Sequence, residues 1–258
     1  MSGKATAEQV FAAGPRVWRV PDQHSTNVCQ ACLGARQLDQ PRLCRGCDPL
    51  FETAPAALQD CIVPMTAVEQ PSPYYSALWA YKTSEPRQIP FLASIVALFT
   101  RANATNITRR LGGPPDLVTI VPSKRGVPFN EQPLRRVVDL VIGLRELLQQ
   151  VAIYQAGEPF RRNRYMPEAF AVVDRAVSGR RVLLIEDTVA SGATAISVAG
   201  ALTTAGATVL VLPVAKIFTT AYWPREHPYF AAMQETWKPS AWARPVAGGD
   251  GTTPPGTG

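Results

Sequence analysis

The second half of the chain alternates between short apolar runs and longer stretches in which apolar residues recur at helical spacing. The runs at 117–122 (LVTIVP), 181–186 (RVLLIE) and 208–216 (TVLVLPVAK) have the length and β-branched content of buried strands. Residues 134–151 and 192–205, which lie between these runs, have the apolar spacing of helices. The alternation predicts an α/β fold with a mostly parallel, twisted sheet flanked by helices.

The rest of the chain predicts less regular structure. Residues 89–112 have the spacing of one helix, which the Gly-Gly-Pro-Pro run at 112–115 ends, and 169–173 (AFAVV) is expected to form a short edge strand. The predicted organisation is an N-terminal arm (1–27), a cysteine-rich module (28–50), a connecting or hood segment with the helix (51–115), the core (116–220), a C-terminal aromatic segment (221–243) and a disordered tail (244–258).

Charge and composition narrow the class of protein. Among the 258 residues, 46% are hydrophobic, but no segment approaches the roughly 20 consecutive apolar residues that a membrane span requires. The N-terminus lacks the apolar region of a secretory signal. We therefore expect a cytoplasmic protein with no membrane partner. The net charge of +6 favours anionic partners such as phosphates or nucleic acid, although a basic surface also serves solubility.

Four of the five cysteines form two CxxC pairs. Cys29 and Cys32 make up the first pair, Cys44 and Cys47 the second, and 11 residues separate the pairs. Two such pairs predict a tetrahedral four-thiolate site for Zn²⁺, which leaves no open coordination position and is therefore structural. A cytosolic setting argues against the alternative of two disulfides, and the spacing suits an iron–sulfur cluster less well. Cys61 is expected to be a small buried hydrophobic residue.

An acidic pair, Glu186 and Asp187, directly follows the apolar residues 182–185, where burying a carboxylate is costly. In open α/β sheets, ligands bind at the carboxyl ends of the strands, and the loop that follows offers backbone N–H groups, hydroxyls and a helix N-terminus for a phosphate. Carboxylates beside such a loop suit a sugar phosphate; the alternative, a helix N-cap with acids in its first turn, does not explain acids at a strand end. The predicted phosphate loop comprises Thr188, Val189, Ala190, Ser191, Gly192, Ala193 and Thr194.

The stretch 182–194 (VLLIEDTVASGAT) resembles the motif with which type I phosphoribosyltransferases bind phosphoribosyl pyrophosphate (PRPP), with Ala190 where a threonine is frequent. Together with the cysteine pairs ahead of it, the stretch is similar to the ComF family of competence-associated proteins. The resemblance extends over residues 28–216 and implies a type I phosphoribosyltransferase fold with a small N-terminal four-cysteine zinc ribbon. The further segments that match the family are YYSALWAYK (74–82), IVPSKRGVPFNEQP (120–133), in which Val127 and Pro128 interrupt a Gly-Phe-Asn sequence, and RRNRYMPEAF (161–170).

The resemblance assigns a role to each segment. Glu186 and Asp187 would bind the ribose hydroxyls and stabilise a positively charged sugar, while the phosphate loop would hold the 5′-phosphate. Pyrophosphate with its Mg²⁺ would lie against Ser123, Lys124, Arg125 and Gly126, of which Lys124 and Arg125 would be catalytic; a solvated basic turn is the alternative. A flexible loop would close over the site, or would instead be a solvated basic loop or a nucleic-acid contact, and its candidates are Arg161, Arg162, Arg164 and Tyr165.

The expected activity is transfer of a 5-phosphoribosyl group to or from a nitrogenous acceptor, with pyrophosphate as the leaving group. The alternatives are a non-catalytic regulator that binds PRPP or a nucleotide, and a competence-type accessory protein that handles single-stranded DNA. The N-terminal arm, residues 50–80 and the aromatic segment 221–242 are the candidate acceptor-binding regions, although packing on the sheet is the preferred interpretation of the last. A homodimer is compatible with the sequence.

Overall fold

The main sheet of the protein has four parallel strands in the order β1-β6-β5-β2. They are β1 (Thr66–Gln70), β2 (Leu117–Ile120), β5 (Arg181–Val189) and β6 (Thr208–Thr219). A separate antiparallel pair contains β3 (Ala152–Tyr154) and β4 (Phe170–Val172). The computed structural model describes residues 5–25, 27–37, 39–40, 42–83, 87–155, 160–161, 163–173, 177–219, 221, 223, 226–233 and 236–244.

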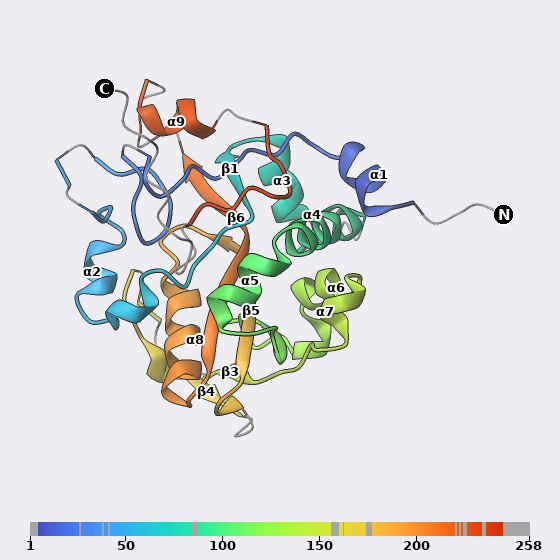
Figure 1. Cartoon of the computed structure of the whole chain (residues 1–258), viewed down its shortest axis with the longest axis vertical. Coiled ribbons are helices and arrows are strands. Elements are labelled where there is room, and N and C mark those ends of the chain that lie inside the picture. Colours follow the sequence, from blue (N-terminus) through green and yellow to red (C-terminus); the bar gives the residue numbers. More distant parts are fainter. Residues whose placement is uncertain are drawn as a thin grey trace, which may run out of the picture.

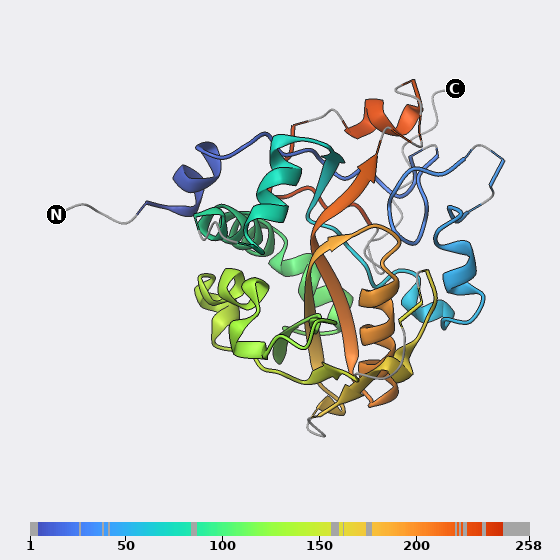
Figure 2. The ribbon, with the colours of Figure 1, turned by 180° about the vertical axis from the view of Figure 1, so that it is seen from behind.

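The two faces of this sheet bury different clusters of apolar residues, and helices lie on both sides of it (Figures 1 and 2). Leu183 and Ile185 of β5 belong to one cluster, and Val182 and Leu184 belong to the other, as the alternation of a strand requires. Helix α8 (Ala193–Thr204) covers the second face. The helices that contribute to the first cluster are α3 (Pro73–Ala80), α4 (Gln88–Ala102), α5 (Ala104–Leu111), α6 (Pro133–Asp139) and α7 (Ile142–Arg145).

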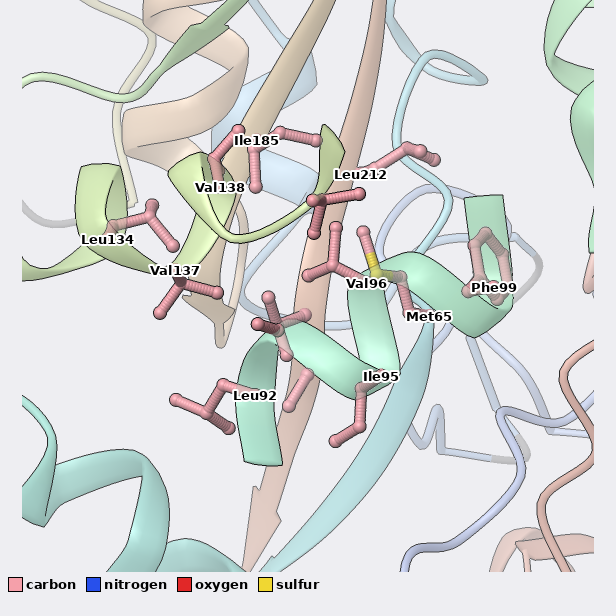
Figure 3. Close-up of a cluster of buried hydrophobic side chains, with 14 of the residues drawn as sticks. Met65, Leu92, Ile95, Val96, Phe99, Leu134, Val137, Val138, Ile185 and Leu212 are labelled. Atoms are coloured by element: carbon pink, nitrogen blue, oxygen red, sulfur yellow. The ribbon is translucent and has the colours of Figure 1, made fainter. Parts of the chain in front are cut away.

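The first cluster is the larger core. Figure 3 shows side chains of α4 and α6 pointing toward those of β5 and β6. The parallel α/β architecture predicted from the apolar runs is therefore confirmed, with helices on both faces of the sheet. The labelled side chains are Met65, Leu92, Ile95, Val96, Phe99, Leu134, Val137, Val138, Ile185 and Leu212.

Both long helices predicted from the sequence are interrupted. The helix expected over 89–112 breaks at Asn103, whose buried side-chain amide donates to the carbonyls of Phe99 (3.0 Å) and Pro239 (2.7 Å). The helix expected over 134–151 ends early because residues 147–149 pair with the edge of β2. There the N–H of Val118 donates to the Leu147 carbonyl, and the Val118 carbonyl accepts from the N–H of Gln149, both at 2.9 Å.

The chain ends hold more structure than the sequence predicts. The N-terminal arm contains α1 (Ala7–Ala12), and Trp18 bridges to Ala67 and Thr236. Arg244, expected at the start of the tail, is buried, and its guanidinium donates to the Ile62 carbonyl at 2.6 Å. The remaining elements are α2 (Asp48–Phe51), α9 (Pro228–Met233), and the 3-10 helices η1 (Ala56–Leu58), η2 (Phe129–Glu131) and η3 (Pro167–Ala169).

The short edge strand predicted at 169–173 is present as β4, but it pairs with β3 and not with the main sheet. The fourth strand of the main sheet is β1, which lies in the predicted connecting or hood segment and pairs with β6. In the part of the chain that the structure describes, no helix has both the length and the apolar character to cross a membrane.

Candidate functional site

A cavity of about 610 Å³ lies at the carboxyl end of the parallel sheet. Most of the predicted site residues line it, as the position of ligand sites in parallel α/β sheets would suggest. The predicted residues in its wall are Ser123, Lys124, Arg125, Glu186, Asp187, Thr188, Val189, Ala190, Ser191, Gly192, Ala193 and Thr194. Gly126 is the one residue of these two segments that is not part of the wall; its φ of +69° places it at a turn just beyond.

The acids reach the cavity because neighbouring strands differ in length. Strand β2 ends at Ile120, which pairs with Ile185, while β5 continues for four more residues. Within the described chain, no strand pairs with 186–189 on the side that β2 vacates. The polar side chains of Glu186 and Asp187 therefore emerge at an opening in the sheet.

Asp187 is held by two residues that follow one another at the end of α3. Tyr81 donates its hydroxyl to Asp187 Oδ2 at 2.6 Å, and Lys82 Nζ lies 2.6 Å from the same oxygen. The Thr188 hydroxyl donates to Asp187 Oδ1 at 3.0 Å. Burial, followed by the charge of Asp187, raises the pKa of Tyr81 well above its usual value, so its hydroxyl remains a donor.

Glu186 is the second carboxyl in the wall of the cavity. Burial, and then the negative charge of Asp187, raise the pKa of Glu186 to about 8, although the positive charge of Lys82 opposes the shift. Most Glu186 carboxyls are therefore protonated at neutral pH. A protonated Glu186 beside Asp187 gives the floor of the cavity one carboxyl that donates a hydrogen bond and acceptor oxygens on both residues.

The loop after β5 is built to present backbone N–H groups. Gly192 has a φ of +83° and caps the N-terminus of α8, a conformation that favours glycine. Ser191 Oγ accepts from the N–H of Ala193 at 3.4 Å. Among the described residues, the N–H groups of Ser191 and Gly192 find no acceptor. These free donors at the start of a twelve-residue helix suit an anion.

The basic turn after β2 joins the loop across the cavity. Lys124 Nζ lies 3.1 Å from Thr194 Oγ1 and 4.3 Å from the centre of the Phe160 ring. Ser123 Oγ accepts from the N–H of Arg125 at 3.2 Å, which folds the turn back on itself. The turn and the loop thus surround one volume from two sides, with a lysine between them.

Of the flexible-loop candidates, the three that the structure describes, Arg161, Arg164 and Tyr165, do not line the cavity. Arg164 lies 3.7 Å from Glu52 in an exposed ion pair, and Tyr165 packs against α8. The N–H of Arg161 donates to the sulfur of Met166 at 3.2 Å, and Arg162 lies outside the described residues. From this segment the wall of the cavity receives Phe160 and Asn163. A closing role for the arginines stays a prediction.

The four cysteines converge on one point, as their spacing predicts. Their sulfur atoms all lie within 4.8 Å of one another, and Cys32 Sγ lies 3.8 Å from Cys44 Sγ. A tetrahedral zinc site with Zn–S bonds of about 2.3 Å places its sulfurs about 3.8 Å apart. The cluster can therefore hold a structural metal ion such as zinc.

The cysteine module consists of turns and not of the strands of a ribbon. In the described part of 28–50, the regular structure is the bridge between Val28 and Ala35 and the helix α2. Part of the C-terminal aromatic segment packs here, and none of its described residues lines the cavity: Tyr229 is buried and donates its hydroxyl to the Leu33 carbonyl at 3.0 Å, whereas Trp237 and Trp242 pack in the first core cluster. Phe230 packs in the same cluster, and Tyr222 lies outside the described residues.

Sequence reasoning missed Tyr81 and Lys82 as site residues. The segment 74–82 resembles a segment of the ComF family, but nothing in its pattern of apolar and polar residues indicates that its end contacts β5. Trp79, an exposed side chain in the same segment, also lines the cavity. No protein-family model and no curated protein matches the chain.

Proposed function

We propose that the cavity binds PRPP and that the protein transfers its 5-phosphoribosyl group to or from a nitrogenous acceptor, with pyrophosphate as the leaving group. One observation carries the proposal. The carboxyls of Glu186 and Asp187 face the same cavity as a loop with free N–H groups, and both lie at the end of β5. Sugar hydroxyls need acceptors, and a phosphate needs donors.

Each side of the cavity has its own task in this reaction. The loop from Thr188 to Thr194 holds the 5′-phosphate, and Glu186 and Asp187 hold the ribose hydroxyls. As the bond from C1 to pyrophosphate breaks, positive charge develops on the sugar, and the negative charge of Asp187 stabilises it. Lys124 and Arg125 stabilise the departing pyrophosphate. Mg²⁺, which would bind with the pyrophosphate, would neutralise part of its charge.

Two further residues complete the proposed site. Tyr81 and Lys82 fix the orientation of the Asp187 carboxylate before the ligand arrives, so that little reorganisation is needed on binding. Trp79 offers an exposed aromatic surface at the cavity, on which a planar acceptor can stack. The type I phosphoribosyltransferase fold, the ComF relationship and zinc in the cysteine cluster belong to the same proposal.

Calorimetric titration of PRPP with Mg²⁺ tests the binding step. We expect micromolar affinity, and we expect its loss in the double variant Glu186→Ala/Asp187→Ala while the circular dichroism spectrum is unchanged. Glu146→Ala, which removes an exposed carboxylate outside the cavity, is the control. Equal affinity in the double variant would refute the assignment. Pyrophosphate release in the presence of acceptor bases then separates an enzyme from a regulator that only binds.

A further inference from the structure

Lys216 is a buried lysine that lies between the cysteine cluster and the phosphate loop. Its side chain is 5% exposed, and Nζ donates to the carbonyl of Ala190 in the loop and to the carbonyl of Ile217 at 3.3 Å. The side chain of Lys216 also passes close to the first cysteine pair. If Gly34 had a Cβ atom, that atom would lie 2.6 Å from Lys216 Cε and 3.3 Å from Cys32 Sγ. Lys216 thus contacts the phosphate loop and lies close to the cysteine cluster.

A second contact joins the same two regions. Cys47 Sγ lies 3.6 Å from the carbonyl oxygen of Ser191, and a Cβ at Gly46 would lie 3.6 Å from Ser191 Cβ. Two consecutive carbonyls of the loop, those of Ala190 and Ser191, are therefore held from the side of the cysteine module. No other part of the described chain donates to these two carbonyls.

The direction of these carbonyls fixes the direction of the donors. In a trans peptide, C=O and the N–H of the next residue point to opposite sides. The carbonyl of Ala190 points at Lys216, so the N–H of Ser191 points away from Lys216. The carbonyl of Ser191 points at Cys47, so the N–H of Gly192 points away from Cys47. Both N–H groups are among those of the loop for which no acceptor is found in the described chain.

The chemistry of the cluster explains why a lysine occupies this position. Four thiolates outweigh the charge of a divalent metal ion, so a loaded centre is net negative and attracts the ammonium group. Burying a charged side chain at a site that an apolar residue could fill is costly, which points to a task other than packing.

We propose that Lys216 is a positioning residue through which the metal-loaded cysteine centre orients the phosphate loop. The metal thereby controls the affinity of the cavity for the phosphate of its ligand, although no cysteine lines the cavity. Binding of PRPP rests on the function proposed above, whereas the coupling of metal to loop does not. The cysteine module then contributes to ligand binding as well as to the stability of the fold.

The test compares wild type, Lys216→Met and the control Lys238→Met, which removes an exposed lysine. For each protein we would measure zinc content, PRPP affinity with Mg²⁺, and amide hydrogen exchange in peptides that cover 188–195 and 88–102. In Lys216→Met we expect zinc to remain, PRPP affinity to fall at least tenfold, and exchange to rise in 188–195 alone. In wild type, chelation of zinc should also weaken PRPP binding, and it should raise exchange in 188–195 by more than the lost stability raises it in 88–102.

A second variant guards against loss of the fold or of zinc in Lys216→Met. Gly34→Ala keeps the lysine but displaces its Cε and Nζ, and should loosen the loop in the same way. Chelating zinc from Lys216→Met should weaken PRPP binding by less than it does in wild type, because the connection is already broken.

The outcomes separate the two proposals. If wild type binds no PRPP but loop exchange still responds to zinc and to Lys216→Met, the coupling stands and the proposed function fails. If PRPP binds with the same affinity in wild type, Lys216→Met and zinc-free protein, the coupling is refuted and the function stands. Loop exchange that is indifferent to both zinc and Lys216 refutes the coupling in either case.

Discussion

The cysteine cluster and the cavity both gather reactive groups into a small volume, but the chain assembles them in opposite ways. The four sulfurs come from one short stretch, 29–47, and lie within 4.8 Å of one another. The cavity draws on the end of α3, the turn after β2, Phe160, Asn163 and the end of β5. The spacing of residues along the sequence predicts a local site, whereas a site assembled from distant segments depends on strand order and on where each strand ends.

The largest effect is expected from breaking the local site. Cys29→Ser removes one of four ligands, and the protein should lose its metal and several kcal/mol of stability, because metal binding contributes directly to folding. Metal analysis and thermal unfolding measure the two losses. Cys61→Ala, which removes a buried thiol outside the cluster, should keep about one equivalent of metal. A Cys29→Ser protein with metal content and stability unchanged would contradict the comparison.

The sequence predicts much of the cavity, and the reason is again locality. Glu186, Asp187 and the loop that follows belong to one continuous motif, so their order alone places them at a strand end. Tyr81 and Lys82 precede Asp187 by more than a hundred residues, and only the packing of α3 beside the sheet brings them to its carboxylate. No periodicity in the segment 74–82 carries that information.

The fold shows the same limit. Strands β5 and β6 are apolar runs and were predicted, whereas β1 (TAVEQ) is short and mixed in polarity and becomes a strand because β6 offers it an edge. Residues 147–149 have helical spacing but pair with β2, since an exposed strand edge has free N–H and C=O groups. In both cases a hydrogen-bonding partner distant in sequence overrides the local pattern.

The next effect concerns Glu186, which the fold places among other charges. Its pKa of about 8 lies above the usual value of 4.5, so the folded protein binds a proton that the unfolded chain releases between these two pH values. By linkage, the stability that this group contributes is present below pH 4.5 and is lost as pH rises toward 8 and above.

Glu186→Gln should remove this dependence. Between pH 5 and 9 the variant should gain on the order of 2 kcal/mol relative to wild type, less than the full shift implies because the cavity admits water. Urea unfolding at each pH gives the two profiles, with Glu146→Gln as the control at an exposed position. Parallel profiles for Glu186→Gln and wild type would show that the sheet end does not hold Glu186 in its protonated form.

A smaller effect is expected at the glycine that shapes the phosphate loop. Gly192→Ala forces a side chain into a φ of +83° and brings its Cβ within 2.6 Å of Ile62 Cδ1. We expect a loss of about 1–2 kcal/mol in stability and weaker PRPP binding. Gly143→Ala in α7, where a Cβ meets no atom within 4 Å, should be neutral or slightly stabilising. Equal effects of the two substitutions on stability and PRPP binding would show that the loop does not require glycine at position 192.

The smallest effect measures the contact that local sequence does not predict. Lys82 and Asp187 are 32% and 15% exposed, so their ion pair is only partly screened by water. A double-mutant cycle with Lys82→Met and Asp187→Asn, read by urea unfolding, should give a coupling free energy of about 1 kcal/mol. The exposed pair of Arg164 and Glu52, at 3.7 Å, should give a value near zero and serves as the control cycle. Coupling at Lys82 no larger than in the control would mean that α3 only covers the sheet. Clear coupling would mean that a helix outside the motif orders the Asp187 carboxylate before any ligand binds.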